Sequence, residues 1–168
     1  MARLDGSVIE PVGADLVALA QAHALDVTVF PHSSLPVIFG SDLPPVLFVA
    51  RAERGGPVVG FVGLRPKDDV LEISGLAVDP AHQRMGLGRA LVKAALRSAR
   101  QREFARVALH VSTGNTAAIT LYESEGFRRA ERLGGFYSPQ RFSEGGDAWR
   151  MIRGRGLRWG AGSVPGGR

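Results

Sequence analysis

The chain has 168 residues, 45% of them hydrophobic and 22% charged, which is typical of one globular domain with a sizeable core. Cysteine is absent, and this excludes disulfide bonds, thiolate metal sites and any covalent intermediate on an enzyme thiol. The net charge of +5 is uneven, because residues 154–168 contain three arginines and no acid. The charge therefore does not indicate a dedicated nucleic-acid surface.

Neither a membrane segment nor a metal cluster is indicated by the sequence. No apolar run approaches the roughly 20 residues that a membrane helix needs, and residues 1–6 lack the form of a secretion signal. We therefore expect a cytoplasmic location and no membrane partner. The four histidines are scattered rather than spaced as ligands, so we expect no metal. They are His23, His32, His82 and His110.

Hydrophobic periodicity and turn residues predict a chain in which strands and helices are mixed. The first part is predicted to hold a strand at 7–11, a helix at 12–24, an ordered loop at 30–45 and strands at 46–52, 58–64 and 70–78. In the first helix, Leu16, Leu19 and Ala20 form the predicted buried stripe. The second part is predicted to hold helices at 88–102 and 115–125 and strands at 105–112, 127–131 and 148–153, in a βαβαβ-like arrangement. Residues 154–168 are rich in glycine and have no apolar periodicity, so we expect a domain at 1–153 and a disordered tail.

One strand-loop-helix segment has the form of a phosphate cradle. After the strand that ends at Val78, Asp79 and Pro80 break the ladder, and Gly86 and Gly88 open the next helix. Unpaired N–H groups at a helix N-terminus attract anions, and glycines let a phosphate approach them closely. A P-loop string is absent, and the third small residue of a Rossmann fingerprint is missing.

Two motifs in this chain resemble those of the GNAT superfamily of N-acetyltransferases. The pattern Gln83-x-x-Gly86-x-Gly88 after a strand resembles that family's acetyl-CoA pyrophosphate loop. Downstream, Asn115-x-x-Ala118-x-x-x-Tyr122-x-x-x-Gly-Phe resembles its closing motif. The resemblance implies an α/β (α+β) GNAT fold, a mixed, mostly antiparallel sheet with splayed parallel central strands flanked by helices. From residue 76 to 151 the chain most resembles the ribosomal-protein alanine N-acetyltransferases.

The resemblance implies acetyl-CoA as cosubstrate, with the pantetheine arm between the splayed strands. Gly75 in the first of these strands marks a bulge or a close ligand approach, or else a packing glycine. Asn115 can cap its helix and also contact the cofactor. The implied cofactor-binding residues are Leu76, Ala77, Val78, Gln83, Arg84, Met85, Gly86, Leu87, Gly88, Arg89, Asn115, Ala118 and Tyr122.

Three residues are candidates for the proton transfers of direct acetyl transfer to an amine. Tyr122 lies two turns beyond Asn115 and is the candidate general acid for the leaving thiolate, with a core aromatic as the alternative. Glu72, a lone carboxylate in an apolar strand, is the first candidate base; the alternative is a solvated edge residue. His110 is the second candidate base. In the ribosomal-protein branch a catalytic glutamate stands in its place, and a structural histidine is the alternative.

The acceptor remains open between several classes at this stage. Tyr137 and Glu144 lie in a late segment similar to the peptide-site loop of the ribosomal-protein branch, which favours a protein or peptide N-terminal α-amine. A small-molecule amine, such as a polyamine, an aminoglycoside or a metabolite, is the alternative, although the acids that could bind a polycation are few. A non-catalytic acetyl-CoA sensor and nucleic-acid binding by the arginine tail are further hypotheses. Both a monomer and a homodimer are compatible with the sequence.

Overall fold

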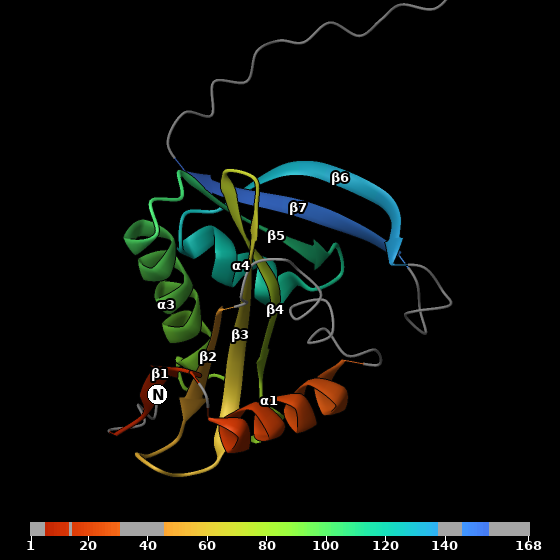
Figure 1. Cartoon of the computed structure of the whole chain (residues 1–168). Helices are drawn as coiled ribbons and strands as arrows, with labels where there is room; N and C mark the ends of the chain where they lie inside the picture. The colour runs from red at the N-terminus through yellow and green to blue at the C-terminus, as the bar shows by residue number, and fades with distance from the viewer. Residues whose placement is uncertain (1–5, 14, 31–45, 138–145, 155–168) are drawn as a thin grey trace, which may run out of the picture.

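The computed structural model describes residues 6–13, 15–30, 46–137 and 146–154, and these build a mixed α/β fold around one sheet. In these ranges seven strands follow the order β1-β2-β3-β4-β5-β7-β6, and helices cover both faces of the sheet (Figure 1). The strands are β1 (Val8–Pro11), β2 (Val46–Arg51), β3 (Val58–Lys67), β4 (Val70–Val78), β5 (Arg106–Ser112), β6 (Arg128–Tyr137) and β7 (Gly146–Gly154). The helices are α1 (Leu16–Val29), the short 3-10 helix η1 (Pro80–His82), α3 (Leu87–Gln101) and α4 (Thr116–Ser124). The predicted fold class is confirmed.

Helix α1 starts later than the sequence predicts because of its cap. The carboxylate of Asp15 accepts hydrogen bonds from the backbone N–H groups of Val17 and Ala18 at 3.0 and 2.9 Å, so the helix begins at Leu16. An N-cap carboxylate satisfies N–H groups that have no partner within the helix. The predicted start at residue 12 was therefore wrong by one turn.

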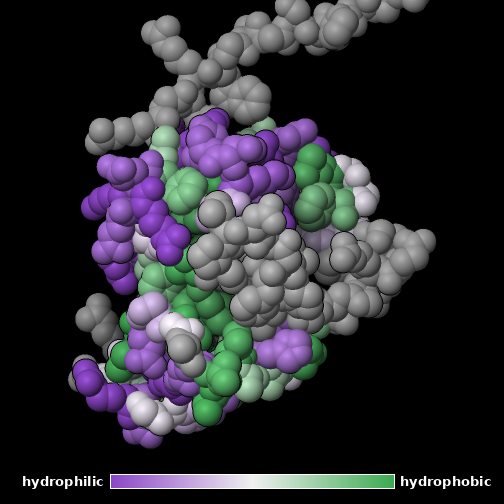
Figure 2. Space-filling view, viewed as in Figure 1, coloured by the Kyte–Doolittle hydropathy of each residue, from purple (hydrophilic) through white to green (hydrophobic). Residues whose placement is uncertain are grey.

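The buried face of α1 also differs from the predicted one. Of the predicted stripe, Leu19 packs on the core, whereas Leu16 is 76% exposed and Ala20 is exposed. The buried residues are Ala18, Ala22 and Asp26. The first turns of this helix are apolar on nearly every side, so periodicity could not select the face that packs on the sheet. In Figure 2, hydrophobic side chains gather over the lower part of the molecule where α1 lies, while α3 presents hydrophilic ones.

The order of the last strands overturns the predicted βαβαβ arrangement. Strand β7 lies between β5 and β6 and is antiparallel to both, so among the described strands β4 and β5 form the parallel pair. β7 pairs with β5 over seven positions, from Arg106↔Gly154 to Ser112↔Ala148. Gly154, predicted as the start of the tail, thus ends β7, and a Cβ there would lie 2.5 Å from the Ala105 carbonyl oxygen. Residues 155–168 and the predicted loop at 31–45 lie outside the described residues.

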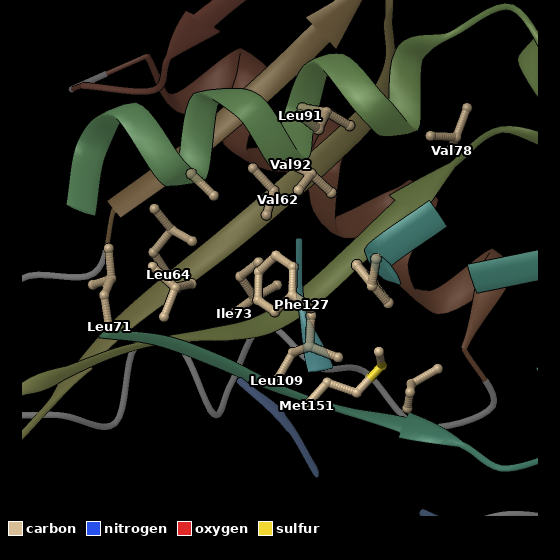
Figure 3. Close-up of a cluster of buried hydrophobic side chains, with 14 of the residues drawn as sticks. Val62, Leu64, Leu71, Ile73, Val78, Leu91, Val92, Leu109, Phe127 and Met151 are labelled. Atoms are coloured by element: carbon tan, nitrogen blue, oxygen red, sulfur yellow. The ribbon is translucent and has the colours of Figure 1, made fainter. Parts of the chain in front are cut away.

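The core has one layer on each face of the sheet. On one face, α3 and α4 pack on the strands through side chains such as Leu91, Val92 and Ile119, which meet Val62, Leu64 and Met151 (Figure 3). On the other face, α1 covers a smaller cluster on β2 and β3. Burial of this kind contributes about 25 cal/mol per Å² of apolar surface. Among the described residues, no helix combines the length and the apolar character that crossing a membrane would require.

The two central strands separate at one place in the sheet. β4 pairs with β5 from Val70↔Arg106 to Ile73↔Leu109, and the parallel ladder stops there. At the same level the register between β3 and β4 shifts, because Gly63 pairs with Gly75 and Leu64 with Ile73. Ser74 is the extra residue of this bulge, and its hydroxyl donates to the Gly63 carbonyl at 3.2 Å. The bulge predicted near Gly75 is confirmed, and beyond Ile73 the edge of β4 faces a gap instead of β5.

Candidate active site

The N-terminus of α3 has free backbone donors. Gly86, at the N-cap, has φ 89° and ψ −2°, a left-handed conformation that glycine adopts without strain, and no side chain caps the helix. The first intrahelical bond at this end runs from the Ala90 N–H to the Gly86 carbonyl, so the N–H groups of Leu87, Gly88 and Arg89 have no partner within the helix. Such groups and the helix dipole attract anions, so the predicted binding of a pyrophosphate here has suitable donors and stays a prediction.

Other residues of this loop have structural contacts of their own. The Gln83 amide donates to the Val78 carbonyl at 3.1 Å and so fixes the loop to the end of β4. Arg84 is exposed at φ 61°, and Met85 is half-buried. The Arg89 guanidinium donates to the Ser124 hydroxyl at 3.1 Å and lies 3.4 Å from the Glu125 carboxylate. Arg89 therefore joins α3 to the end of α4.

Structural roles account for residues of both motifs, at the start of α3 and at the start of α4. Leu87 is buried in the core, and a Cβ on Gly88 would lie 3.3 Å from Leu121 Cδ2, so this glycine lets α3 approach α4. The Asn115 side chain caps α4 by accepting from the Ala118 N–H at 3.0 Å. The predicted capping role of Asn115 is confirmed, and its contact with the cofactor stays a prediction.

The end of β4 offers backbone groups to the gap. Asp79 donates its N–H to the Val59 carbonyl at 2.8 Å, and in an antiparallel ladder the residues that bond to the partner strand alternate. Ala77 therefore directs its backbone groups toward β3, whereas Leu76 and Val78 direct theirs toward the gap. Of the three residues predicted to hold the pantetheine arm, Leu76 and Val78 thus have the suitable backbone orientation.

Tyr122 lies in α4 and belongs to the buried cluster between the helices and the sheet. Its side chain is 7% exposed, and its ring meets the Phe127 ring edge-on at 5.8 Å. Burial raises the pKa of the Tyr122 phenol to about 12, and the electrostatic effect of Tyr137 adds to the rise. The hydroxyl is therefore a hydrogen-bond donor at every physiological pH. Its aromatic ring packs in the core, so the alternative of a core aromatic is confirmed, and its role as general acid stays a prediction.

Glu72 and His110 come together on the sheet face opposite to α3 and α4, because their strand neighbours Ile73 and Leu109 belong to the core under those helices. Oε1 of Glu72 lies 3.3 Å from Nδ1 of His110, and Oε2 accepts from the Arg65 guanidinium at 2.7 Å. The hydrogen bond from His110, followed by that from Arg65, holds the pKa of Glu72 at about 2. Glu72 is 8% exposed, so the alternative of a solvated glutamate was wrong. At neutral pH the group is a buried carboxylate with a partner on each oxygen.

Aromatic side chains of β6 extend this cluster toward Tyr122. The Phe136 ring stacks on the His110 ring with a centroid distance of 4.6 Å and an interplanar angle of 20°. Tyr137 meets Phe136 edge-on at 5.1 Å, and burial raises its pKa. Glu72, His110 and Tyr137 are thereby connected through Phe136, and Tyr137 acts electrostatically on Tyr122, the fourth predicted site residue. Glu144 lies outside the described residues.

A hollow of about 290 Å³ opens beside this cluster. Its walls come from the β3–β4 turn and from strands β4 to β7, and they carry charges of both signs. The lining residues are Lys67, Asp68, Val70, Glu72, Ala108, His110, Glu131, Leu133 and Arg150. Asp69, the neighbour of Asp68, does not line the hollow and pairs with Arg106.

Sequence reasoning missed Arg65, Phe136 and Arg150 as members of the site. Arg65 pairs with Glu72 through the β3–β4 register, Phe136 reaches His110 from β6, and Arg150 is the register partner of His110 on β7. Each contact depends on strand order. β7 follows β6 in the sequence, yet in the sheet it lies between β5 and β6. One available signal was the charge of Arg65, which follows a run of buried residues in its strand, much as Glu72 stands among apolar residues in β4.

Comparison with known proteins gives consistent results. The sequence model of the acetyltransferase (GNAT) family matches residues 17–127. N-alpha-acetyltransferase RimI of Mycobacterium tuberculosis is 36% identical over 129 residues, which are 72% of this chain and 75% of that protein. A mycothiol acetyltransferase of Thermobispora bispora is 41% identical over 85 residues, 46% of this chain, but the match spans 29% of that longer protein.

A solved structure extends the similarity over nearly the whole chain. The ribosomal-protein-S18-alanine N-acetyltransferase of Escherichia coli superposes with a TM-score of 0.73 at 27% identity. The match covers 94% of this chain and 99% of the E. coli chain. The sheet and its flanking helices therefore form the arrangement seen in that enzyme.

Proposed function

The chain belongs to the GNAT family and is an acetyl-CoA-dependent N-acetyltransferase, and from this premise we propose that it acetylates the N-terminal α-amine of a protein or peptide. The observation that carries this proposal is the hollow on the sheet face opposite to α3 and α4, which His110 and Glu72 line. An acceptor can reach this hollow from the side opposite to α3 and α4. The relative named an N-alpha-acetyltransferase, which matches most of the chain, supports the same acceptor.

The cosubstrate fits the other face. The uncapped N-terminus of α3 and the left-handed Gly86 provide donors for a pyrophosphate. Backbone groups of Leu76 and Val78 at the β4 edge can bond the amides of a pantetheine arm. Acetyl-CoA supplies an activated thioester, which an amine can attack without a covalent enzyme intermediate. In this proposal the two substrates meet at the gap beyond Ile73.

The amine must lose a proton before it attacks, and its pKa decides how difficult that step is. An α-amine has a reference pKa near 8 and a lysine near 10.4, whereas an imidazole has one near 6.5. Deprotonation of a lysine ammonium thus costs about 3 kcal/mol more than deprotonation of an α-ammonium, whichever base accepts the proton. A histidine in the hollow therefore suits an α-amine better than a lysine side chain.

Tyr122 serves the leaving group in this proposal. A thiol has a reference pKa near 8.5, so a phenol with a pKa of about 12 does not give up its proton completely to a thiolate. It donates a hydrogen bond to the sulfur instead, and this bond strengthens as negative charge develops there. Tyr122 thus acts as a donor that stabilises the departing thiolate.

A small-molecule amine is the second candidate acceptor. The partial match to a mycothiol acetyltransferase favours it. A polyamine or an aminoglycoside fits less well, because Lys67 and Arg150 line the hollow together with its carboxylates. Like charges in the same site oppose a polycation. The charge pattern therefore favours an acceptor with one cationic amine.

The experiment is acetylation of a defined mixture followed by mass spectrometry. The mixture contains one peptide with a free N-terminus and no lysine, the same peptide N-terminally blocked and carrying one lysine, a polyamine and an aminoglycoside. We expect acetylation of the free α-amine at least about tenfold faster than that of the lysine, in the direction that the reference pKa values set. Faster acetylation of the lysine peptide or of a small amine would reject the proposed acceptor and leave the family assignment intact.

A further inference from the structure

Glu72 divides its two carboxylate oxygens between different partners. Oε2 accepts from Arg65 at 2.7 Å, and Oε1 faces Nδ1 of His110 at 3.3 Å. Phe136 stacks on one face of the His110 ring. The imidazole is therefore held along one edge and on one face, and Nε2 is the ring nitrogen that this carboxylate does not engage.

We propose that Glu72 is a positioning residue and that Arg65, Glu72 and His110 form one unit, with Nε2 of His110 as the base that deprotonates the amine. This inference rests on the proposed amine acetylation and deepens it. It differs from the sequence-based prediction, in which Glu72 itself was the first candidate base.

The hydrogen-bond chemistry of the ring supports this assignment. A carboxylate accepts hydrogen bonds and cannot donate them, so the imidazole proton resides on Nδ1 and the lone pair on Nε2. When Nε2 takes a proton, the resulting imidazolium lies beside the ionised Glu72 carboxylate, which stabilises it. The same carboxylate that orients the ring thus favours its protonated form.

Glu72 is poorly suited to be the base itself. Two donors hold its pKa at about 2, far below the pKa of any amine acceptor. A proton that it accepted would also have to displace the hydrogen bond from Arg65 or the one from His110. Breaking a buried charge pair costs several kcal/mol.

Other charged groups around His110 act more weakly on the ring. Arg150 faces it from β7 as its register partner, Glu131 is the register partner of Arg150 on β6, and Lys67 and Asp68 reach the same hollow from the β3–β4 turn. Lys67, Asp68 and Glu131 are exposed, so water screens their charges. On β6, Tyr137 lies behind Phe136. Glu72 is thus the buried charge in direct contact with the imidazole.

The protons balance in the proposed reaction. The ammonium gives one proton to Nε2, and the amine nitrogen then forms a bond to the thioester carbon. The carbon–sulfur bond breaks, and the second proton lost by the nitrogen goes to the thiolate that Tyr122 has stabilised. His110 finally releases its proton to solvent, so no further reactant is needed.

The first test is the pH profile of kcat/KM for Glu72→Gln. The glutamine amide oxygen can still accept from Nδ1, so this variant keeps the orientation and removes the charge. We expect the acid limb of the profile to move toward lower pH, because the variant removes the negative charge that lies beside Nδ1 of the ring. We expect His110→Gln to lower kcat about 10²-fold or more and to remove that limb. Acetyl-CoA binding should stay nearly unchanged in both variants.

A matched control comes from the far edge of the sheet. Glu10 pairs with the buried Arg51 at 2.6 Å, a geometry close to that of Glu72 with Arg65, and Glu10→Gln should leave the profile unchanged. An acid limb that stays in place in Glu72→Gln would overturn the inference. So would a limb that survives in His110→Gln and disappears in Glu72→Gln.

A second measurement does not need turnover. Long-range ¹H–¹⁵N NMR spectra distinguish the two imidazole tautomers, and the His110 signals are those that His110→Gln removes. We expect the Nδ1–H tautomer at high pH, and the Nε2–H tautomer would contradict the proposal. The pH profile is measured on whichever amine the enzyme acetylates, so an incorrect acceptor class and an incorrect base give different results.

Discussion

Gly86 is the residue at which the proposed cofactor site depends most on backbone conformation. Its φ of 89° lies in the left-handed region, and a Cβ there would meet no atom within 4 Å. Gly86→Ala therefore causes no steric clash with neighbouring atoms, and its effect comes from the strained backbone conformation. A residue with a Cβ pays about 1–2 kcal/mol to adopt this region. We expect the loop to relax part of this strain in the free enzyme, so that Tm falls by less than the about 2–8 °C that the full cost would give in a domain of this size.

The same strain should appear in acetyl-CoA binding. If the backbone of the Gly86→Ala variant relaxes out of the left-handed region in the free enzyme, the N–H groups at the start of α3 turn away from their positions. Binding must then restore them at the same cost of about 1–2 kcal/mol, which corresponds to a roughly 5–30-fold higher Kd. Isothermal titration calorimetry measures this change directly.

Gly55 provides the matched control for this prediction. It has φ 76°, lies in the turn between β2 and β3, and would also place a Cβ in open space. Gly55→Ala should therefore lower Tm by a similar amount and leave the Kd for acetyl-CoA nearly unchanged. Two results would refute the reasoning about the α3 N-terminus. One is an equal Kd for acetyl-CoA in Gly86→Ala and the wild type, and the other is an equal loss of affinity in Gly86→Ala and Gly55→Ala.

Two further predictions concern Tyr122 and Glu72. Tyr122→Phe removes the hydroxyl and keeps the packed ring, so kcat should fall about 10²-fold while the Kd for acetyl-CoA stays nearly unchanged. Steady-state kinetics measures the first quantity and calorimetry the second. An unchanged kcat would remove Tyr122 from the mechanism. Glu72 has a pKa of about 2 in the folded state, below the 4.5 of a free glutamate, so its ion pair stabilises the fold fully above the pKa of the free group. That stabilisation is lost as the pH falls through the folded-state pKa of about 2. The difference in unfolding free energy between wild type and Glu72→Gln should thus shrink by about 3 kcal/mol between about pH 5 and pH 2 in urea titrations, and a constant difference would contradict the assigned ion pair.

Local signals in the sequence were sufficient for the helix starts that depend on nearby residues. Asn115 caps α4 as its position before an apolar run indicates, and glycine at Gly86 marks a backbone turn into α3. The bulge at Ser74 was likewise visible through Gly75. Each of these features depends on residues close together in the chain, where local chemistry controls the backbone.

Features that depend on distant strands could not be read from the sequence. The contact of Glu72 with His110 joins two strands separated by α3, and the stacking of Phe136 requires β7 to lie between β5 and β6. The two candidate bases were therefore predicted as competitors, although they lie in contact. For α1, a helix apolar on nearly every side gave no basis for choosing its buried face.

The central claim is that an α-amine and acetyl-CoA meet at the gap between β4 and β5. The most direct test is a crystal structure with a bisubstrate ligand, in which CoA is joined through an acetyl linker to the N-terminus of a short peptide. We expect the pyrophosphate at the N–H groups of Leu87 to Arg89, the pantetheine arm along Leu76 and Val78, and the peptide in the hollow beside His110. A peptide bound elsewhere, such as in the hollow between α1 and Pro80, would contradict the account.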